Sequence, residues 1–285
     1  MDRNEPQFFN IFEQPWRSLA DVEFAHGLDT RLISSDSDTG AATFMSRLPA
    51  GSTRNLSPSD GTLELFVLEG SLALDGDPVV TSGVVTLPQG TEPRELRAPD
   101  GAQVLVFWSP GLPATEAKVT SVQAEPWVET EMPDLQHSSY HKSLRTPDVA
   151  EGEMHGGPGG VLRFVLIVPS LGTHQEEVHH ACWEEIIVLR GDLMMPERGY
   201  AAPGTYLANP PDFWHGPWTS HGGNLHLVQT VTPVGIEYRD YTGGPELVEE
   251  YVDTTSWVEQ PSHRAWTDDD RRRHVDLTPD PARGG

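Results

Sequence analysis

Short runs of apolar residues, separated by turn-forming glycines and prolines, set the pattern of this chain. The runs occupy residues 63–68, 79–80, 84–87 and 104–108, and then residues 162–168, 185–189, 205–208 and 225–231. Runs of Val, Leu, Ile and Phe of this length, bounded by Gly and Pro, are typical of β-strands. Helical periodicity is sparse. The pattern therefore predicts an all-β protein.

Two stretches of the chain repeat one spacing of glycines. Gly51 and Gly70 bound the first stretch, Gly172 and Gly191 bound the second, and a constant offset of 121 residues relates them. The apolar residues that precede Gly70 also match those that precede Gly191. A self-match of this period is as long as a domain and indicates a tandem duplication. Two sandwiches or jelly-roll barrels in one chain are the natural arrangement, because they hide the edges of their sheets.

The duplication predicts the domain organisation. We expect an N-terminal barrel in residues 1–118 and a C-terminal barrel in residues 119–242. Residues 243–285 form a tail, which has enough apolar content near its start to dock on a barrel and ends in a charged, glycine-rich stretch expected to be disordered.

Composition narrows the classes of function. The formal net charge of −24 should repel phosphate backbones and anionic lipid surfaces, so we expect neither a nucleic acid nor a membrane as a partner. No apolar stretch is long enough to span a bilayer, and the polar start does not resemble a secretion signal. With a single cysteine, Cys182, the chain forms no internal disulfide, so we expect a cytoplasmic protein.

The glycine-bounded stretches resemble the motifs of the cupin superfamily, and two copies resemble a bicupin. The family's first motif is G-x5-H-x-H-x3/4-E-x6-G and its second is G-x5-P-x-G-x2-H-x3-N. The second copy of this chain supplies Gly172, His180, Glu184 and Gly191 for the first motif and Gly204, Pro210 and His215 for the second. The local sequence around Cys182 and Asn209 is similar to that of bacterial metal-binding cupins related to anti-sigma sensor domains.

Three positions depart from these motifs. Val178 stands where the first motif histidine belongs, Asp212 replaces a glycine, and Thr219 replaces the final asparagine. Metal binding must therefore be argued from the remaining residues.

Three side chains of the second copy form the predicted metal site. Alternate residues of a strand face the same side, so residues 178 and 180 should both point into the barrel, and the next strand should bring Glu184 back to the same depth. His215 follows the Pro-Pro turn and should close the set. Two imidazoles and one carboxylate with open positions are typical of non-haem Fe(II) oxygenases. We expect one divalent ion held by His180, Glu184 and His215: Fe(II), with Mn, Ni and Zn as alternatives.

The fourth ligand position has two candidates. A one-residue bulge would turn His179 inward, and a site of three histidines and one glutamate resembles those that the family uses for Fe, Mn, Ni or Zn. His174 is the reserve ligand or a substrate contact. His226 is interpreted as a hydrogen-bonded core residue and Cys182 as a small buried apolar residue.

The first copy lacks this chemistry. Ser57, Ser59 and Leu63 occupy the positions that correspond to Val178, His180 and Glu184, and His26 is the only histidine among residues 1–120. We therefore expect the N-terminal barrel to be structural, to form a dimer surface or to line the pocket, although a separate apolar ligand there stays open.

Two classes of function remain. In the first, a mononuclear metal enzyme acts on a small organic substrate, as an Fe(II) dioxygenase with O2 as co-substrate or as a redox-neutral Mn or Zn isomerase, decarboxylase or lyase. In the second, the chain is a non-catalytic metal-binding sensor. Because cupin barrels often pair through strands, the resemblance implies a homodimer.

Overall fold

The computed structural model describes the chain apart from several loops and the tail. The described residues are 3, 5–18, 23–112, 116–126, 128–129, 139–145, 160–167, 176–191, 193–195, 198–217, 224–232 and 235–240. The expected tail, residues 243–285, lies outside them. The described regular elements are strands and two single-turn 3-10 helices, Ile11–Glu13 (η1) and Glu23–Ala25 (η2), which confirms the predicted all-β fold. No helix among these residues is long and apolar enough to cross a membrane.

The chain forms two compact units. The first comprises Met1–Glu5 and Ile11–Glu125, and the second comprises Pro6–Asn10 and Pro126–Gly285. The division between the units follows Glu125, and Lys118–Ser121 pairs within the first unit. A short segment near the N-terminus also belongs to the second unit, which the repeat did not indicate.

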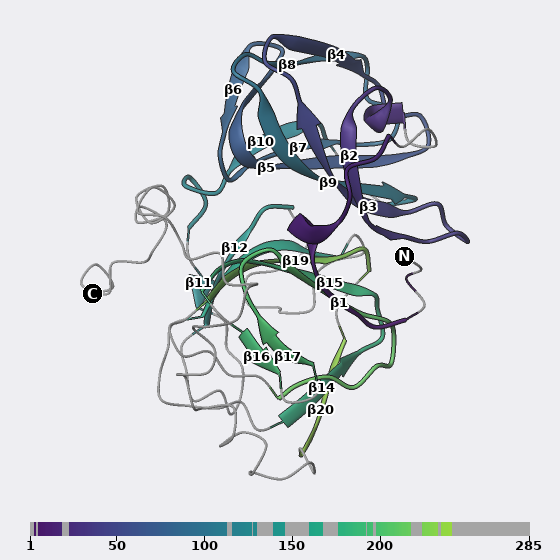
Figure 1. Cartoon of the computed structure of the whole chain (residues 1–285), viewed down its shortest axis with the longest axis vertical. Helices are drawn as coiled ribbons and strands as arrows, with labels where there is room; N and C mark the ends of the chain where they lie inside the picture. The colour runs from purple at the N-terminus through teal and green to yellow at the C-terminus, as the bar shows by residue number, and fades with distance from the viewer. Residues whose placement is uncertain are drawn as a thin grey trace, which may run out of the picture. The chain divides into compact units, whose positions relative to one another are not determined.

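The strands of the first unit curve into a β-barrel (Figure 1), and its largest described apolar cluster includes Phe44, Leu65 and Val104. Its strands are β2 (Asp29–Ser35), β3 (Ala42–Leu48), β4 (Ser52–Leu56), β5 (Gly61–Leu74), β6 (Asp77–Val80), β7 (Gly83–Leu87), β8 (Arg94–Ala98), β9 (Ala102–Pro110) and β10 (Lys118–Ser121). The main order is β10-β7-β5-β9-β3-β2, and β8 joins β4 to β5.

The long strand β5 turns the corner of this barrel. Its first part pairs with β7 and β9, and its last part pairs with β6 and β8. The register against β9 shifts between Val67 and Glu69, a β-bulge that bends the strand and increases its twist. Leu65, Val85 and Val104 are fully buried in the core that results.

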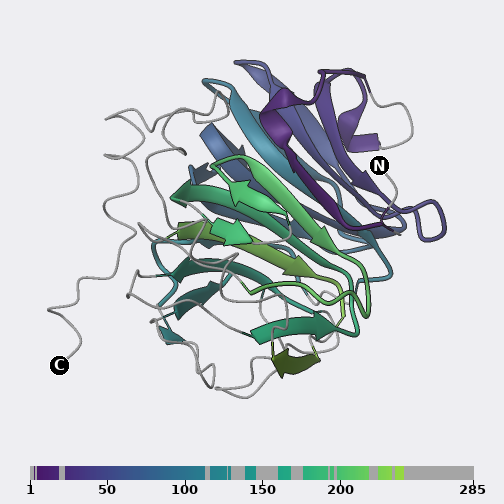
Figure 2. The same cartoon turned by 60° about the horizontal axis from the view of Figure 1, so that its bottom comes forward.

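The second unit contains a seven-stranded antiparallel sheet and two short strand pairs. Its strands are β1 (Gln7–Asn10), β11 (Val128–Glu129), β12 (Ser139–Ser143), β13 (Leu162–Ile167), β14 (Glu176–His180), β15 (Glu184–Gly191), β16 (Leu193–Met195), β17 (Gly199–Ala201), β18 (Thr205–Asn209), β19 (Asn224–Thr230) and β20 (Ile236–Asp240). The sheet order is β1-β18-β15-β19-β13-β12-β11, with β14 paired to β20 and β16 to β17. The turned view in Figure 2 shows its long strands as curved, adjacent arrows.

The edge strand β1 of the second unit comes from the N-terminal part of the chain. β1 pairs antiparallel with β18, with Phe9 opposite Tyr206 and their ring centroids 5.3 Å apart. Phe8 packs against the apolar cluster that contains Val188 and Leu207. The segment therefore covers an edge that would otherwise expose unpaired backbone groups.

Candidate metal centre

Two strand ends and one residue of a connecting segment bring the predicted ligands together. His180 ends β14 and Glu184 begins β15, so the short turn between them returns the chain to the same level. His215 lies outside the named strands, but its backbone exchanges two hydrogen bonds of 2.9 Å with Val178 on β14. The pairing with Val178 fixes the position of His215 beside the strand that carries His180.

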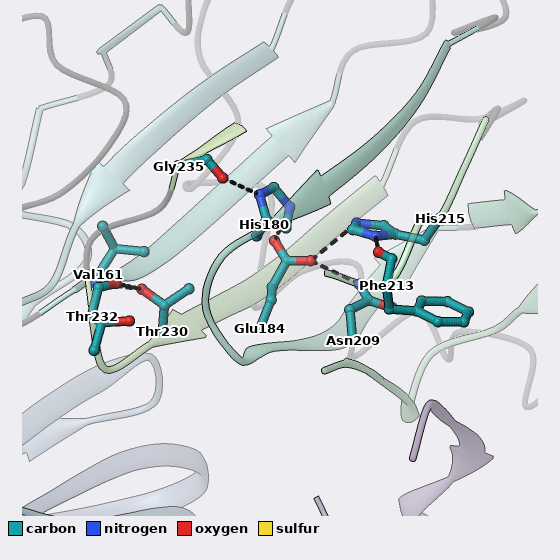
Figure 3. A network of polar contacts seen from close by, with 9 residues as sticks. All are labelled: Val161, His180, Glu184, Asn209, Phe213, His215, Thr230, Thr232 and Gly235. Carbon is teal, nitrogen blue, oxygen red and sulfur yellow. Dashed lines mark hydrogen bonds and ion pairs between the residues drawn. The ribbon is translucent and has the colours of Figure 1, made fainter. Parts of the chain in front are cut away.

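The three side chains form a compact, buried cluster (Figure 3). Each offers a ligand atom, and these atoms lie within 4.8 Å of one another. His180 Nε2 is 3.5 Å from Glu184 Oε1, and His215 Nε2 is 3.4 Å from Glu184 Oε2. The exposed fractions of the three residues are 6%, 8% and 5%. The predicted set of His180, Glu184 and His215 is therefore assembled at one point.

Backbone carbonyls orient both imidazoles. His180 Nδ1 is 3.3 Å from the carbonyl oxygen of Gly235, and His215 Nδ1 is 3.0 Å from that of Phe213. A carbonyl can only accept, so each Nδ1 carries the proton and each Nε2 presents its lone pair toward Glu184. This tautomer, held by a second hydrogen bond, is typical of metal-ligating histidines.

The electrostatics favour the ligand forms of these groups. Burial lowers the pKa of His180 and so favours the neutral imidazole. Burial alone would raise the pKa of Glu184, but the adjacent imidazoles of His180 and His215 and a hydrogen bond from Asn209 together lower it. Asn209 Nδ2 donates to Glu184 Oε2 across 2.8 Å. The sequence argument missed Asn209, although its place directly before the Pro-Pro turn was a usable signal.

The turn before His215 tolerates the missing motif glycine. Asp212 adopts a φ of 61°, the left-handed conformation that glycine favours and that Asp enters more readily than most residues. Its backbone N–H donates to the carbonyl oxygen of His180 across 2.8 Å. The substitution thus keeps the turn that attaches the second motif to β14.

The structure does not bring His179 into the cluster. β14 pairs with β20 in unbroken register, so the bulge expected to turn His179 inward is absent from this described strand, and alternation sends its side chain to the opposite face. His179 Nε2 is instead 3.0 Å from Glu237 Oε2, and its ring packs against Trp214 with centroids 4.3 Å apart. The structure therefore does not place His179 among the ligands that it brings together.

His226 and Cys182 do not join the cluster. His226 is buried and its Nδ1 lies 2.6 Å from Asn224 Oδ1, and burial lowers its pKa to about 4, as for a neutral core histidine. Burial raises the pKa of Cys182 to about 12, so the thiol is protonated and is a poor ligand. The reserve ligand His174 lies outside the described residues.

The donor set fits a divalent transition metal. It comprises two neutral imidazoles and one carboxylate, all buried and with their donor atoms converging, which is the ligand type of non-haem Fe(II) sites and also suits Zn and Mn. Within the described part of the chain this is the one such group of three or more His, Cys, Asp or Glu residues, and it lies in the second unit as the repeat predicted.

Comparisons with known proteins agree on the fold. No family model matches the sequence, and no curated protein matches it. Among solved structures, a candidate dioxygenase from Nostoc punctiforme superposes with a TM-score of 0.65 at 18% identity, covering 84% of this chain and 88% of that one. A cupin 2 barrel protein from Leptotrichia buccalis has a TM-score of 0.51 at 10% identity, covering 79% and 96%.

A two-barrel relative in fold extends this likeness along the chain. The oxalate decarboxylase of Lactobacillus farciminis, solved with formate, has a TM-score of 0.50 at 14% identity and covers 89% of this chain and 95% of its own. Identities this low establish the fold alone. The chain therefore has the bicupin form of the cupin fold, with a His, Glu and His cluster in its second barrel.

Proposed function

We propose that the second barrel is a mononuclear metal site and that the protein is an Fe(II)-dependent dioxygenase acting on a small organic substrate. The observation that carries the proposal is the convergence of two imidazole nitrogens and one carboxylate within 4.8 Å inside the barrel. His180, Glu184 and His215 would hold the ion. O2 is the oxidant, and both of its atoms enter the products.

Among the residues that the structure describes, no fourth side chain joins the cluster, and this suits the chemistry. Three protein ligands leave coordination positions for a substrate and O2, as in the facial arrangement of non-haem iron oxygenases. Val178 occupies the motif position of a histidine and lies beside His215, so it presents an apolar surface where other cupins would place a ligand. Burial of all three ligands keeps bulk water away from reactive species.

The ion and the chain have separate tasks in this proposal. When bound, Fe(II) supplies one-electron chemistry toward O2 and Lewis acidity toward an oxygen donor of the substrate. The chain orients the ligands: Gly235 and Phe213 fix the imidazoles, and Asn209 fixes the carboxylate. The name of the Nostoc neighbour, a candidate dioxygenase, agrees with the proposal.

Anaerobic metal analysis followed by O2 uptake tests the proposal. The untagged protein is purified without oxygen, its metal is identified by mass spectrometry, and Fe(II) is restored to the apoprotein. O2 consumption is then measured with 1,3-dicarbonyl, hydroxyketone and phenolic compounds, with Glu184→Gln as the matched control. Uptake that needs both Fe(II) and Glu184 supports a dioxygenase. Bound iron without O2 uptake on any of these compounds counts against it and favours a sensor.

A redox-neutral reaction is the second candidate. The same donors accept Mn or Zn, which would polarise a carbonyl or carboxylate for decarboxylation, isomerisation or lyase chemistry. The fold likeness to an oxalate decarboxylase is the observation that keeps this reading. Tightly held Mn or Zn, together with CO2 release or isomerisation without net O2 consumption, would replace the dioxygenase assignment with this one.

A further inference from the structure

The first barrel has a cavity at the end that corresponds to the metal centre of the second. The cavity measures about 370 Å³, and its lining includes Ser57, Ser59 and Leu63. At the repeat offset of 121 residues these are the counterparts of Val178, His180 and Glu184. The register agrees, since Leu63 lies between Leu87 and Trp108 as Glu184 lies between Asn209 and Thr230. The first barrel therefore has a cavity at the position where the second barrel has its ligand cluster.

Apolar and aromatic side chains form the inner part of this cavity. Phe24, Leu56 and Leu63 line it and are buried, and Trp108 is half-buried beside them. Trp108 shares the inward face of the barrel with Leu63, its partner across the β5 and β9 pairing. Gly61 makes room for it, because a Cβ there would lie 2.8 Å from Trp108 Cζ2. A planar ring of a ligand could pack on the surfaces of this inner part.

A guanidinium enters the same cavity. Arg54 pairs in register with the fully buried Leu96, so its side chain starts on the inward face of β4. Its Nη1 donates to the carbonyl oxygen of Phe24 across 3.1 Å and its Nη2 donates to that of His26 across 2.5 Å. These two bonds fix the plane of the guanidinium and leave its Nε–H for another acceptor.

The contacts of Arg54 include no carboxylate among the described residues. Its partners are the two carbonyl oxygens and the ring of Phe24, whose centroid is 5.8 Å from Cζ. Arg94 and Arg97, on the neighbouring strand β8, instead pair with Asp75 and Glu95. Arg54 is half-buried, and this burial lowers the pKa of its guanidinium. A bound anion would give the Arg54 guanidinium a charged acceptor.

We propose that the first barrel binds a small aromatic carboxylate without a metal. The carboxylate would accept hydrogen bonds from Arg54, and the ring would lie against Trp108 and the apolar residues beside it. The volume of about 370 Å³ lies within the range of small-molecule sites. Asp60, the acidic residue of the lining, is exposed at the rim and accepts a hydrogen bond from the hydroxyl of Ser59, so it bounds the mouth of the cavity.

Titration calorimetry with 2-naphthoate tests this site on the full chain. We expect saturable binding to the wild type and to His215→Ala, a variant that removes a ligand of the second barrel. Arg54→Met should raise the Kd about tenfold or more, because the charge-assisted bond is lost. The neutral analogue 2-naphthol should bind about tenfold more weakly than 2-naphthoate.

A second variant keeps the test valid if Arg54→Met does not fold. Ser59→Phe places a ring in the mouth of the cavity without removing an apolar contact, and it should abolish binding. Thr53→Phe adds the same ring to the outward face of β4, where Thr53 is exposed, and should leave the Kd unchanged. Absence of binding to the wild type, loss of binding in His215→Ala, or retention in both cavity variants would overturn the site. Equal affinity for 2-naphthol would overturn the carboxylate.

Discussion

Asn209 and Glu184 are direct partners in the antiparallel pairing of β18 with β15, and the Asn209 amide donates to Glu184 Oε2 across 2.8 Å. Asn209 lies next to the predicted ligands, but its side-chain amide is not a good metal ligand. It constrains the carboxylate so that Oε1 lies toward His180 and Oε2 toward His215. Asn209 therefore acts as a positioning residue for the metal ligand.

Replacing Asn209 by Ala should weaken metal binding by about 10- to 100-fold, as for other partners that orient metal ligands. The carboxylate would remain but lose its fixed orientation. Competition with a chromogenic chelator measures the affinity, and circular dichroism checks the fold. Asn10→Ala is the matched control, since it removes a hydrogen bond that the Asn10 side-chain amide donates to the carbonyl oxygen of Pro203, at the opposite end of β18. Equal losses in both variants would assign the effect to general stability.

Removal of a predicted ligand should empty the site. We expect His215→Ala and Glu184→Gln to be purified without bound metal, because two remaining donors hold a divalent ion poorly and Gln lacks the negative charge. Ser57→Ala should keep the full metal content, since Ser57 belongs to the first barrel and donates to the carbonyl oxygen of Thr91. Elemental analysis of untagged protein decides this. Wild-type stoichiometry in Glu184→Gln would contradict the assignment.

His179→Ala should keep its metal. The ring of His179 lies 3.0 Å from Glu237 Oε2 and packs on Trp214, on the face of β14 opposite His180. We expect a metal affinity within about twofold of wild type, with a loss of about 1 kcal/mol in the free energy of unfolding, because the contacts of the ring with Trp214 and Glu237 are removed. Metal loss as complete as in His215→Ala would show that β14 adopts the bulged register when the ion is bound.

The repeat and the motif spacing predicted the fold and the ligand cluster for a physical reason. Strand alternation fixes which residues share a face, so the spacing of His180 and Glu184 across one turn determined their common depth. His215 comes from a more distant part of the sequence and was found because the second copy contains a His after the Pro-Pro turn. The Val178 and His215 backbone pairing supplies the missing geometric link.

The features that sequence could not supply depend on local register and on long-range pairing. Whether His179 turns inward depends on a bulge, and a bulge leaves no clear signal in five residues of one strand. β1 pairs with β18, almost 200 residues away, so no local pattern announced that Gln7–Asn10 belongs to the second unit. The Asn209 contact likewise required the β15 and β18 register.

Cys182 should resist alkylation in the native protein. Burial raises the pKa of its thiol to about 12, so the reactive thiolate is scarce at neutral pH, and the residue is 3% exposed. Iodoacetamide should leave the folded protein unmodified by mass spectrometry and should add one adduct in urea. Rapid labelling of folded protein would contradict both the burial and the protonated state.

The N-terminal strand should stabilise the second unit, although most of the first unit separates the two in sequence. Phe9→Ala removes the ring that packs on the fully buried Tyr206, and we expect a loss of about 1 to 3 kcal/mol in the free energy of unfolding. Phe12→Ala is the matched control: Phe12 is 39% exposed, belongs to the first unit and should change stability by about 0.5 kcal/mol or less. Urea unfolding is monitored by metal release. This signal reports on unfolding of the second unit, because the described ligand cluster lies there. If Phe9→Ala leaves the metal-release transition in place while Phe12→Ala moves it, then β1 does not support the second barrel in solution.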